Sequence, residues 1–131
     1  MDRSEQLENI LDHYQNPRHH GELAGADVHV EGGLPGCSDL VTLYLKIEGD
    51  KIEQVSFTGE GCTISQASAS MLSELVAGMS LEDAAALDHD FISDMIGKEI
   101  VETRPRCATL SLDVLRAALK KYRKEQIEKG K

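Results

Sequence analysis

Two alternating segments joined by a short turn constrain the fold of this chain more than any other feature. In both segments apolar residues recur at every second position, at Val41, Leu43, Leu45, Ile47, Val55 and Phe57. Since successive side chains of a strand point to opposite faces, Leu40–Ile47 and Ile52–Thr58 are expected to be strands with one buried face. Gly49-Asp50 lies between them and favours a tight turn. The sequence therefore predicts an antiparallel hairpin.

Apolar residues at helical spacing dominate the chain outside this hairpin. A short strand is expected near Val28–Val30. The predicted helices cover Ser4–Tyr14, Ser65–Ala77, a segment after Ser80, Asp90–Ile96, and a final stretch with Ala108, Leu112, Leu115, Leu119 and Tyr122 on one face. Because the strands come first and most helices follow, we expect an α+β domain, in which helices cover one side of a small antiparallel three-stranded sheet.

The predicted helices carry capping signals at their ends. Ser4 and Ser80 are predicted N-caps, and Gly78 is predicted to end a helix, because these residue types satisfy or terminate the free backbone groups of helix ends. Leu7, Ile10, Leu11 and Tyr14 are expected to form an apolar stripe along the first helix. The apolar stripe of the helix Ser65–Ala77 is expected to include Leu75.

The size and charge of the chain argue against several classes of function. At 131 residues and 14.4 kDa it has room for one domain, residues 1–131. Its net charge of -9 argues against binding to nucleic acid or to anionic membranes. No apolar run approaches the ~18 to 20 residues of a membrane span, and the start lacks a signal-peptide pattern. We therefore expect a cytoplasmic protein.

Charge is unevenly distributed along the chain. Residues 1–113 hold 7 basic and 21 acidic groups, a balance of -14, whereas residues 114–131 hold 7 basic and 2 acidic groups, a balance of +5. Cations near the C-terminus of a helix interact favourably with its dipole, so a solvated helix end explains this pattern. A docking surface for an acidic partner is the alternative.

The chain has three cysteines, Cys37, Cys62 and Cys107, and no CxxC pair. An odd number in a reducing compartment argues against a disulfide framework. Cys62 and Cys107 each precede a predicted helix, whose N-terminus lowers a thiol pKa and favours the thiolate. If the loops meet, the three sulfurs and the Asp39 carboxylate are enough for a tetrahedral zinc site or one face of an iron–sulfur cluster. Scattered buried cysteines and a loop-capping Asp39 are the alternatives.

Four segments resemble a known family. Gly59–Ser70 resembles the signature helix of the IscU/SufU (NifU N-terminal-like) iron–sulfur cluster assembly scaffolds. His13–Gly21, Cys37-Ser38-Asp39 and Arg106–Leu110 are similar to the family's N-terminal stretch, first ligand loop and last ligand loop, in the correct order. The resemblance implies the SufE/NifU-like α+β fold and the ligand set Cys37, Asp39, Cys62 and Cys107.

The resemblance also implies a function. The expected function is a scaffold, rather than an enzyme, that accepts sulfur from a cysteine desulfurase, assembles a [2Fe-2S] cluster and passes it to apo iron–sulfur acceptor proteins. The alternative is a zinc-dependent sulfurtransferase subunit, with Zn2+ at the same site, that accepts persulfide sulfur and activates its desulfurase.

Departures from the family pattern point partly to the IscU branch and partly to the SufU branch of the family. Arg106 replaces the histidine that IscU proteins carry before the last cysteine, as in SufU. The segment from Val101 to Arg106 lacks the Leu-Pro-Pro-Val-Lys motif of IscU, which argues against a dedicated Hsp70 chaperone. However, the chain also lacks the SufU insertion of about twenty residues between Cys62 and Cys107. The chain is SufU-like in local motifs and IscU-like in length.

Which cysteine accepts the sulfur is inferred from the residues around each one. Cys37 is expected to be the sulfur acceptor, because Gly32, Gly33 and Gly36 should let its loop move. Cys107 is the alternative acceptor, because Arg104 and Arg106 could lower its pKa or meet the incoming persulfide; solvated charge is the other interpretation of these arginines. The histidines His19 and His20 are expected to be solvated rather than ligands.

Overall fold

The order of the elements follows the predicted sequence of strands and helices. The computed structural model describes residues 3–33 and 39–129. Its elements in chain order are α1 (Arg3–Gln15), β1 (Val28–Gly33), β2 (Leu40–Glu48), β3 (Lys51–Glu60), α2 (Thr63–Val76), α3 (Leu81–Ala85), α4 (His89–Ile96), α5 (Lys98–Thr103) and α6 (Pro105–Lys129). Within these ranges the strands form a three-stranded antiparallel sheet in the order β1-β2-β3.

The predicted hairpin is confirmed. β2 pairs with β3 so that Leu43 lies opposite Phe57 and Leu45 opposite Val55, and all four side chains are buried. Gly49 adopts a φ of 64° in the turn, a left-handed conformation that glycine reaches without strain. A register shift between Lys46 and Ile47 keeps Ile47 opposite the buried Ile52. The alternate apolar residues of the two segments thus form one face of the core.

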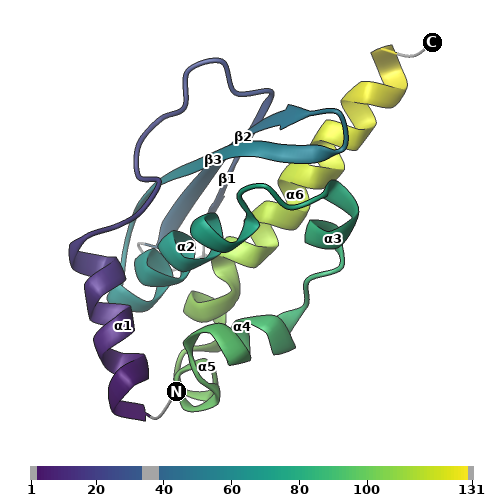
Figure 1. The fold of residues 1–131 in the computed structure, drawn as a ribbon. Coiled ribbons are helices and arrows are strands. Elements are labelled where there is room, and N and C mark those ends of the chain that lie inside the picture. The colour runs from purple at the N-terminus through teal and green to yellow at the C-terminus, as the bar shows by residue number, and fades with distance from the viewer. Residues whose placement is uncertain (1–2, 34–38, 130–131) are drawn as a thin grey trace.

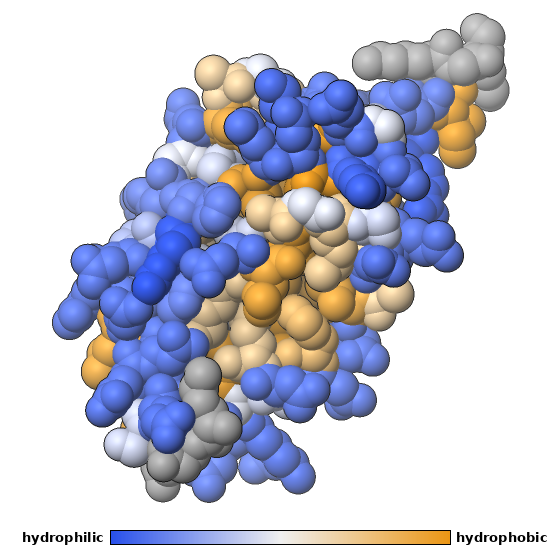
Figure 2. Space-filling view, viewed as in Figure 1, coloured by the Kyte–Doolittle hydropathy of each residue, from blue (hydrophilic) through white to orange (hydrophobic). Residues whose placement is uncertain are grey.

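Helices cover one face of the sheet, as expected (Figure 1). α6 packs on β1 and β2, and α2 packs on β3 and on α6. α1 packs against α2. The buried apolar side chains of the sheet, α2, α4 and α6 form one cluster. Figure 2 shows hydrophilic residues around an apolar area in the middle of the face drawn in Figure 1.

Two predictions for α1 and one for α2 are wrong. α1 begins at Arg3, so Ser4 lies inside the helix rather than at its N-cap. Of the predicted stripe, Ile10 is buried, whereas Leu7, Leu11 and Tyr14 are 40%, 51% and 45% exposed. Leu75 of α2 is also exposed. α1 lies at the edge of the fold and contacts α2, so a narrow line of side chains is enough to attach it.

The predicted ends of the later helices are largely confirmed. The backbone N–H of Asp83 donates to the Ser80 side chain at 3.0 Å, which makes Ser80 the N-cap of α3. Gly78 follows α2 with a φ of 85°. The short helix α5 was not predicted, because it buries no residue completely and therefore carries no amphipathic pattern. None of the helices within residues 3–33 and 39–129 is long and apolar enough to cross a bilayer.

Candidate metal centre

Three segments that are distant in the sequence meet at one end of the sheet. Asp39 directly precedes β2, Cys62 directly precedes α2, and Cys107 lies in the first turn of α6. The register pairs Leu40 with Glu60, so the start of β2 lies beside the end of β3 and brings Asp39 next to Cys62. Because α6 packs against α2, its first turn reaches the same corner.

The side chains of Asp39, Cys62 and Cys107 form a compact cluster. Their potential ligand atoms, a carboxylate oxygen and two Sγ atoms, all lie within 4.8 Å of one another. Cys107 S–H donates to Asp39 Oδ2 at 3.0 Å, and the backbone N–H of Cys62 donates to Asp39 Oδ1 at 2.7 Å. Asp39 and Cys107 are buried, and Cys62 is half-buried. One carboxylate therefore joins the two cysteine segments.

Cys62 is oriented by the start of α2. It is the N-cap residue of this helix, and its Sγ accepts a hydrogen bond from the backbone N–H of Ser65 at 3.4 Å. The hydroxyl of Ser65, which is completely buried, donates to the backbone carbonyl of Cys62 at 3.1 Å. Ser65 was not predicted as a site residue. Its signal in the sequence is the three-residue spacing from Cys62, which is the spacing of an N-cap and its N3 residue.

Gly61 lets the chain pass close to Asp39. Its φ is 135°, a conformation that L side chains rarely adopt. A Cβ atom at this position would lie 2.0 Å from Asp39 Oδ1 and 2.8 Å from its Cα. The close approach is what allows the next residue, Cys62, to donate its N–H to the carboxylate. Glycine is therefore required here by both backbone conformation and space.

Burial and hydrogen bonding shift two pKa values at the site. Burial, the hydrogen bonds with Asp39 and Cys62, and the charges of these neighbours together raise the pKa of Cys107 to about 12. Burial also acts to raise the pKa of Asp39, but hydrogen bonds from Cys107 and from Cys62 outweigh it, so this pKa lies below its usual range. The cluster thus pairs a protonated thiol with an ionised carboxylate.

The expectation that the helix N-terminus makes Cys107 a thiolate is wrong in this structure. Cys107 does not precede α6 but lies within its first turn, where it is buried beside the negative Asp39. The low dielectric of that position and the carboxylate charge favour the neutral thiol more than the helix dipole favours the thiolate. Nor do Arg104 and Arg106 lower this pKa, since both side chains are exposed.

The donor set suits a thiophilic metal. Two cysteines and a carboxylate are common zinc ligands, and two sulfurs bound to one zinc ion at about 2.3 Å lie about 3.8 Å apart, so a cluster within 4.8 Å fits a single ion. Cysteine sulfur also binds iron in iron–sulfur clusters. Cys37, the fourth predicted ligand and predicted sulfur acceptor, lies outside the described residues. The structure therefore brings together three members of the predicted set.

The glycines expected to make the Cys37 loop mobile are partly in regular structure. Gly32 and Gly33 belong to β1, where they lie opposite Val41 and Leu40 of β2. A Cβ atom on Gly32 would lie 2.4 Å from a methyl carbon of Val114, so this glycine serves close packing of α6 on the sheet. The idea that Gly32 and Gly33 loosen the loop is therefore wrong.

A groove lies beside Gly61 and the end of β3. It has a volume of about 410 Å3 and is lined by Tyr14, Pro17, His20, Phe57, Gly59, Glu60, Gly61 and Gln66. The rings of His20 and Phe57 form a T-shaped pair, with 5.2 Å between ring centroids. Its lining includes Gly61, the residue before Cys62, but none of Asp39, Cys62 and Cys107. His19 and His20 are exposed and are not among its candidate ligands.

Sequence comparison finds relatives that are named for iron–sulfur cluster assembly or for sulfur transfer. The NifU-like N terminal domain family matches residues 5–129. The chain is 38% identical to the iron-sulfur cluster assembly scaffold protein IscU of Streptococcus pyogenes serotype M1, over 86% of this chain and 80% of that protein. It is 36% identical to the zinc-dependent sulfurtransferase SufU of Bacillus subtilis strain 168, over 86% of this chain and 87% of that protein.

Comparison with solved structures agrees with the sequence comparison. The fold superposes with a TM-score of 0.71 on a crystal structure described as a putative iron-sulfur cluster assembly scaffold protein for the SUF system from Fervidobacterium islandicum AW-1. The two chains are 31% identical, and the match covers 86% of this chain and 94% of the other. The relatives thus include proteins named for a cluster scaffold and a protein named for zinc-dependent sulfur transfer.

Proposed function

The chain belongs to the NifU-like N-terminal domain family, and we propose that it is a scaffold on which an iron–sulfur cluster is assembled before transfer to apo-proteins. The observation that carries this proposal is the cluster of Asp39, Cys62 and Cys107. These residues come from three distant segments, yet their ligand atoms lie within 4.8 Å of one another. Buried cysteines with only a structural role would not need to surround an ionised carboxylate.

We assign the cluster ligands to Cys37, Asp39, Cys62 and Cys107. Cys37 precedes Asp39 by two residues in the sequence, so the two belong to one ligand loop. The other three residues supply two thiol groups and one carboxylate at a corner of the sheet. A carboxylate is a weaker ligand for iron than a thiolate, so Asp39 would make the cluster easier to release. A donor scaffold requires such release.

The sulfur donor in this proposal is a cysteine desulfurase. A thiolate of this chain attacks the terminal sulfur of the donor's persulfide, a new S–S bond forms on this chain, and the donor leaves as its own thiolate. The groove of Tyr14, His20 and Phe57, which also includes Gly61 next to Cys62 in the chain, gives a donor segment room to bind. Cys107 is buried with a raised pKa, so it is a poor attacking group, which favours Cys37 as the first acceptor.

Zinc-dependent sulfur transfer is the second candidate function. It is favoured by the spacing of the three ligand atoms, which fits one ion, whereas a [2Fe-2S] cluster distributes its ligands over two irons. Cys37, Asp39, Cys62 and Cys107 would hold the zinc ion. When bound, zinc would keep the coordinating cysteines deprotonated at neutral pH.

Metal analysis of the anaerobically purified protein distinguishes the two functions. For a scaffold, the protein is first incubated with a cysteine desulfurase, cysteine, ferrous iron and a reductant. We then expect it to contain iron and sulfide and to show the visible absorption of an iron–sulfur cluster. The cluster should then move to an added apo-ferredoxin. One tightly bound zinc ion, no cluster under these conditions, and faster desulfurase turnover would instead establish the second function.

Variants of the cluster provide the control for this experiment. Cys62→Ser and Cys107→Ser should each abolish cluster assembly or zinc retention, because each removes one sulfur ligand. Ser73→Ala, a buried substitution in α2 remote from the ligand atoms, should retain both. If the two cysteine variants bind metal like the parent, Cys62 and Cys107 do not belong to the metal site and the proposal is wrong.

A further inference from the structure

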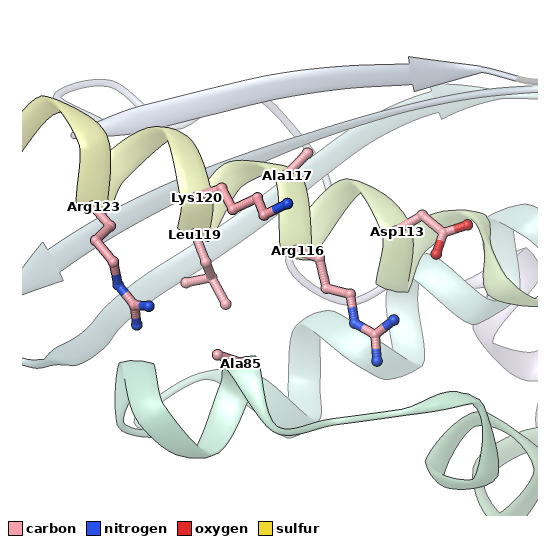
Figure 3. Close-up of a pocket in the computed structure, with 7 residues that line it drawn as sticks. All are labelled: Ala85, Asp113, Arg116, Ala117, Leu119, Lys120 and Arg123. Atoms are coloured by element: carbon pink, nitrogen blue, oxygen red, sulfur yellow. The ribbon is translucent and has the colours of Figure 1, made fainter.

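A groove with basic edges lies between α3 and α6, on a different part of the molecule from the cysteine cluster. It has a volume of about 460 Å3 and is lined by Ala85, Asp113, Arg116, Ala117, Leu119, Lys120 and Arg123. Figure 3 shows Arg116, Leu119 and Arg123 extending from α6 on the side of α3, with Lys120 lying along α6 toward Ala117. A second hollow of about 200 Å3 shares Leu119 and Arg123 and adds Leu81, Tyr122 and Gln126.

The charge of this groove is opposite to that of the rest of the chain. Arg116, Lys120 and Arg123 line it together with one acidic residue, Asp113. Within the described part of the chain, none of these three cations forms an ion pair with a carboxylate. The guanidinium of Arg116 donates to the Leu87 carbonyl at 2.5 Å, which fixes it at the edge of the groove. The groove thus has three cations and one carboxylate in its lining.

The spacing of the cations defines a line along α6. Arg116, Lys120 and Arg123 are separated by four and three residues, which places them on one face of the helix over about 10 Å. The apolar part of the lining comes from Leu119 of α6 and from Leu81 and Ala85 of α3. From Asp113 to Gln126 the two hollows extend along α6 for about 20 Å, the length of a helix of about 13 residues.

We infer that this groove docks an acidic helical segment of a partner protein, with carboxylates three and four residues apart beside a stripe of apolar side chains. The carboxylates would pair with Arg116, Lys120 and Arg123, and the apolar stripe would cover Leu119 and Ala85. A nucleic acid is disfavoured because the chain carries a net charge of -9. A small anion would leave the apolar floor uncovered.

Binding of a designed probe to the isotope-labelled full chain tests this inference. The probe is a 14-residue helical peptide in which leucines and glutamates each recur at three- and four-residue spacing, and the matched probe has glutamine in place of every glutamate. By NMR titration we expect amide shifts in α3 and around Leu119 with the acidic probe. Binding should weaken about fivefold or more between low and physiological salt, because the pairs are exposed.

Charge-reversal variants locate the contact. Lys120→Glu should weaken binding of the acidic probe about fivefold, whereas Lys124→Glu, the same change on the same helix outside the groove, should alter it less than about twofold. Ala85→Glu should also weaken binding, and the neighbouring exposed Ala86→Glu is its control. Far-ultraviolet circular dichroism checks that each variant is folded.

Several outcomes would overturn the inference. One is equal binding of the glutamine probe, because the cations would then contribute nothing. Another is a set of shifts centred on α1 or the sheet. Shifts of the same pattern with inorganic phosphate alone would identify a simple anion site, and shifts with a short DNA duplex would identify a nucleic-acid surface. Absence of binding at millimolar probe concentration would show that the groove does not accept an acidic helix.

Discussion

The Asp39 carboxylate accepts hydrogen bonds from both Cys62 and Cys107, so its loss should change the metal affinity of the site and the lifetime of a bound iron–sulfur cluster. Asp39→Ala removes the acceptor for the Cys62 N–H and for the Cys107 thiol. We expect zinc affinity to fall about 10- to 100-fold, or, if the protein carries a cluster, the cluster to persist longer because its weak oxygen ligand is gone. Competition with a zinc chelator and decay of the visible absorption measure these effects. Asp94→Ala, an exposed carboxylate on α4, is the control; equal behaviour of the two variants would remove Asp39 from the ligand set.

Gly61 offers a test of how closely the backbone must approach Asp39. Gly61→Ala should lower metal affinity and destabilise the fold by about 1–3 kcal/mol, because its Cβ would meet the Asp39 carboxylate. Gly21→Ala is a matched control, since Gly21 has a similar φ of 128° with no atom within 4 Å of an added Cβ. Urea unfolding and chelator competition give both quantities. If Gly21→Ala lowers metal affinity as much as Gly61→Ala, backbone strain rather than the approach to Asp39 is responsible.

The order of sulfur acceptance should follow the accessibility of the thiols. Cys107 is buried and protonated at neutral pH, and Cys62 is held at the N-cap of α2. Labelled sulfur from a cysteine desulfurase should therefore reach Cys107→Ser and Cys62→Ser faster than Cys37→Ser, as measured by mass spectrometry of the persulfide. Unchanged loading of Cys37→Ser together with slow loading of Cys107→Ser would assign the first step to Cys107.

At the scale of elements, α2 contains four buried serines, of which Ser68 and Ser70 connect it to its neighbours. Ser65, Ser68, Ser70 and Ser73 are all completely buried. The hydroxyl of Ser68 donates to the Ala108 carbonyl in α6 at 2.8 Å, and Ser70 Oγ accepts the Arg18 N–H at 2.9 Å and lies 2.8 Å from His13 Nδ1. Their small size lets the helices approach closely, and their hydroxyls satisfy the polar groups that this approach buries.

The bond from Ser68 to Ala108 holds the first turn of α6, which contains Cys107. Ser68→Ala should destabilise the fold by about 1–3 kcal/mol, because it leaves buried polar groups unpaired, and should also weaken metal binding. Ser73→Ala is the matched control, since its hydroxyl bonds to Ala69 within α2. Thermal unfolding and chelator competition provide the readouts. Loss of stability without any loss of metal affinity would show that Ser68 does not position Cys107.

At the scale of the whole molecule, His13 makes stability depend on pH. Burial, and then the charge of Arg18, lower the pKa of His13, while Glu74 and Asp12 act in the opposite direction. Because the folded-state pKa lies below the usual 6.5, the unfolded chain takes up a proton first as pH falls. The free energy of unfolding should therefore decrease below about pH 6.5, by at most about 1.4 kcal/mol per pH unit.

Urea unfolding between pH 8 and pH 5 measures this dependence. His13→Gln should flatten the loss of stability below pH 6.5, because the group that titrates differently in the two states is gone. His29→Gln, an exposed histidine of β1, should keep the slope of the parent. The same slope in all three proteins would mean that His13 does not cause it.

The parts of the fold that were predictable are those with a local cause. Alternation in Leu40–Ile47 and helical spacing in the segment after Cys62 identified β2 and α2, because burial of one face imposes these periods. Asp39, Cys62 and Cys107 were recognisable from their motifs as candidate ligands, and the structure brings them together. The high pKa of Cys107 was not, because it depends on a carboxylate 68 residues away. Likewise, Gly61 looked like a turn residue, and its contact with Asp39 is visible only in three dimensions.

The continuity of α6 has a consequence for how many proteins this chain can hold at once. This helix runs unbroken from Pro105 to Lys129, with Cys107 in its first turn and Leu119 in the basic groove. Twelve residues of helix separate these two positions by about 18 Å. The groove begins at Asp113, six residues or about 9 Å along α6 from Cys107, and it extends away from the cysteine corner, so a helical segment lying in it would leave that corner open to a second protein. Occupancy of the two places should therefore be simultaneous rather than competitive.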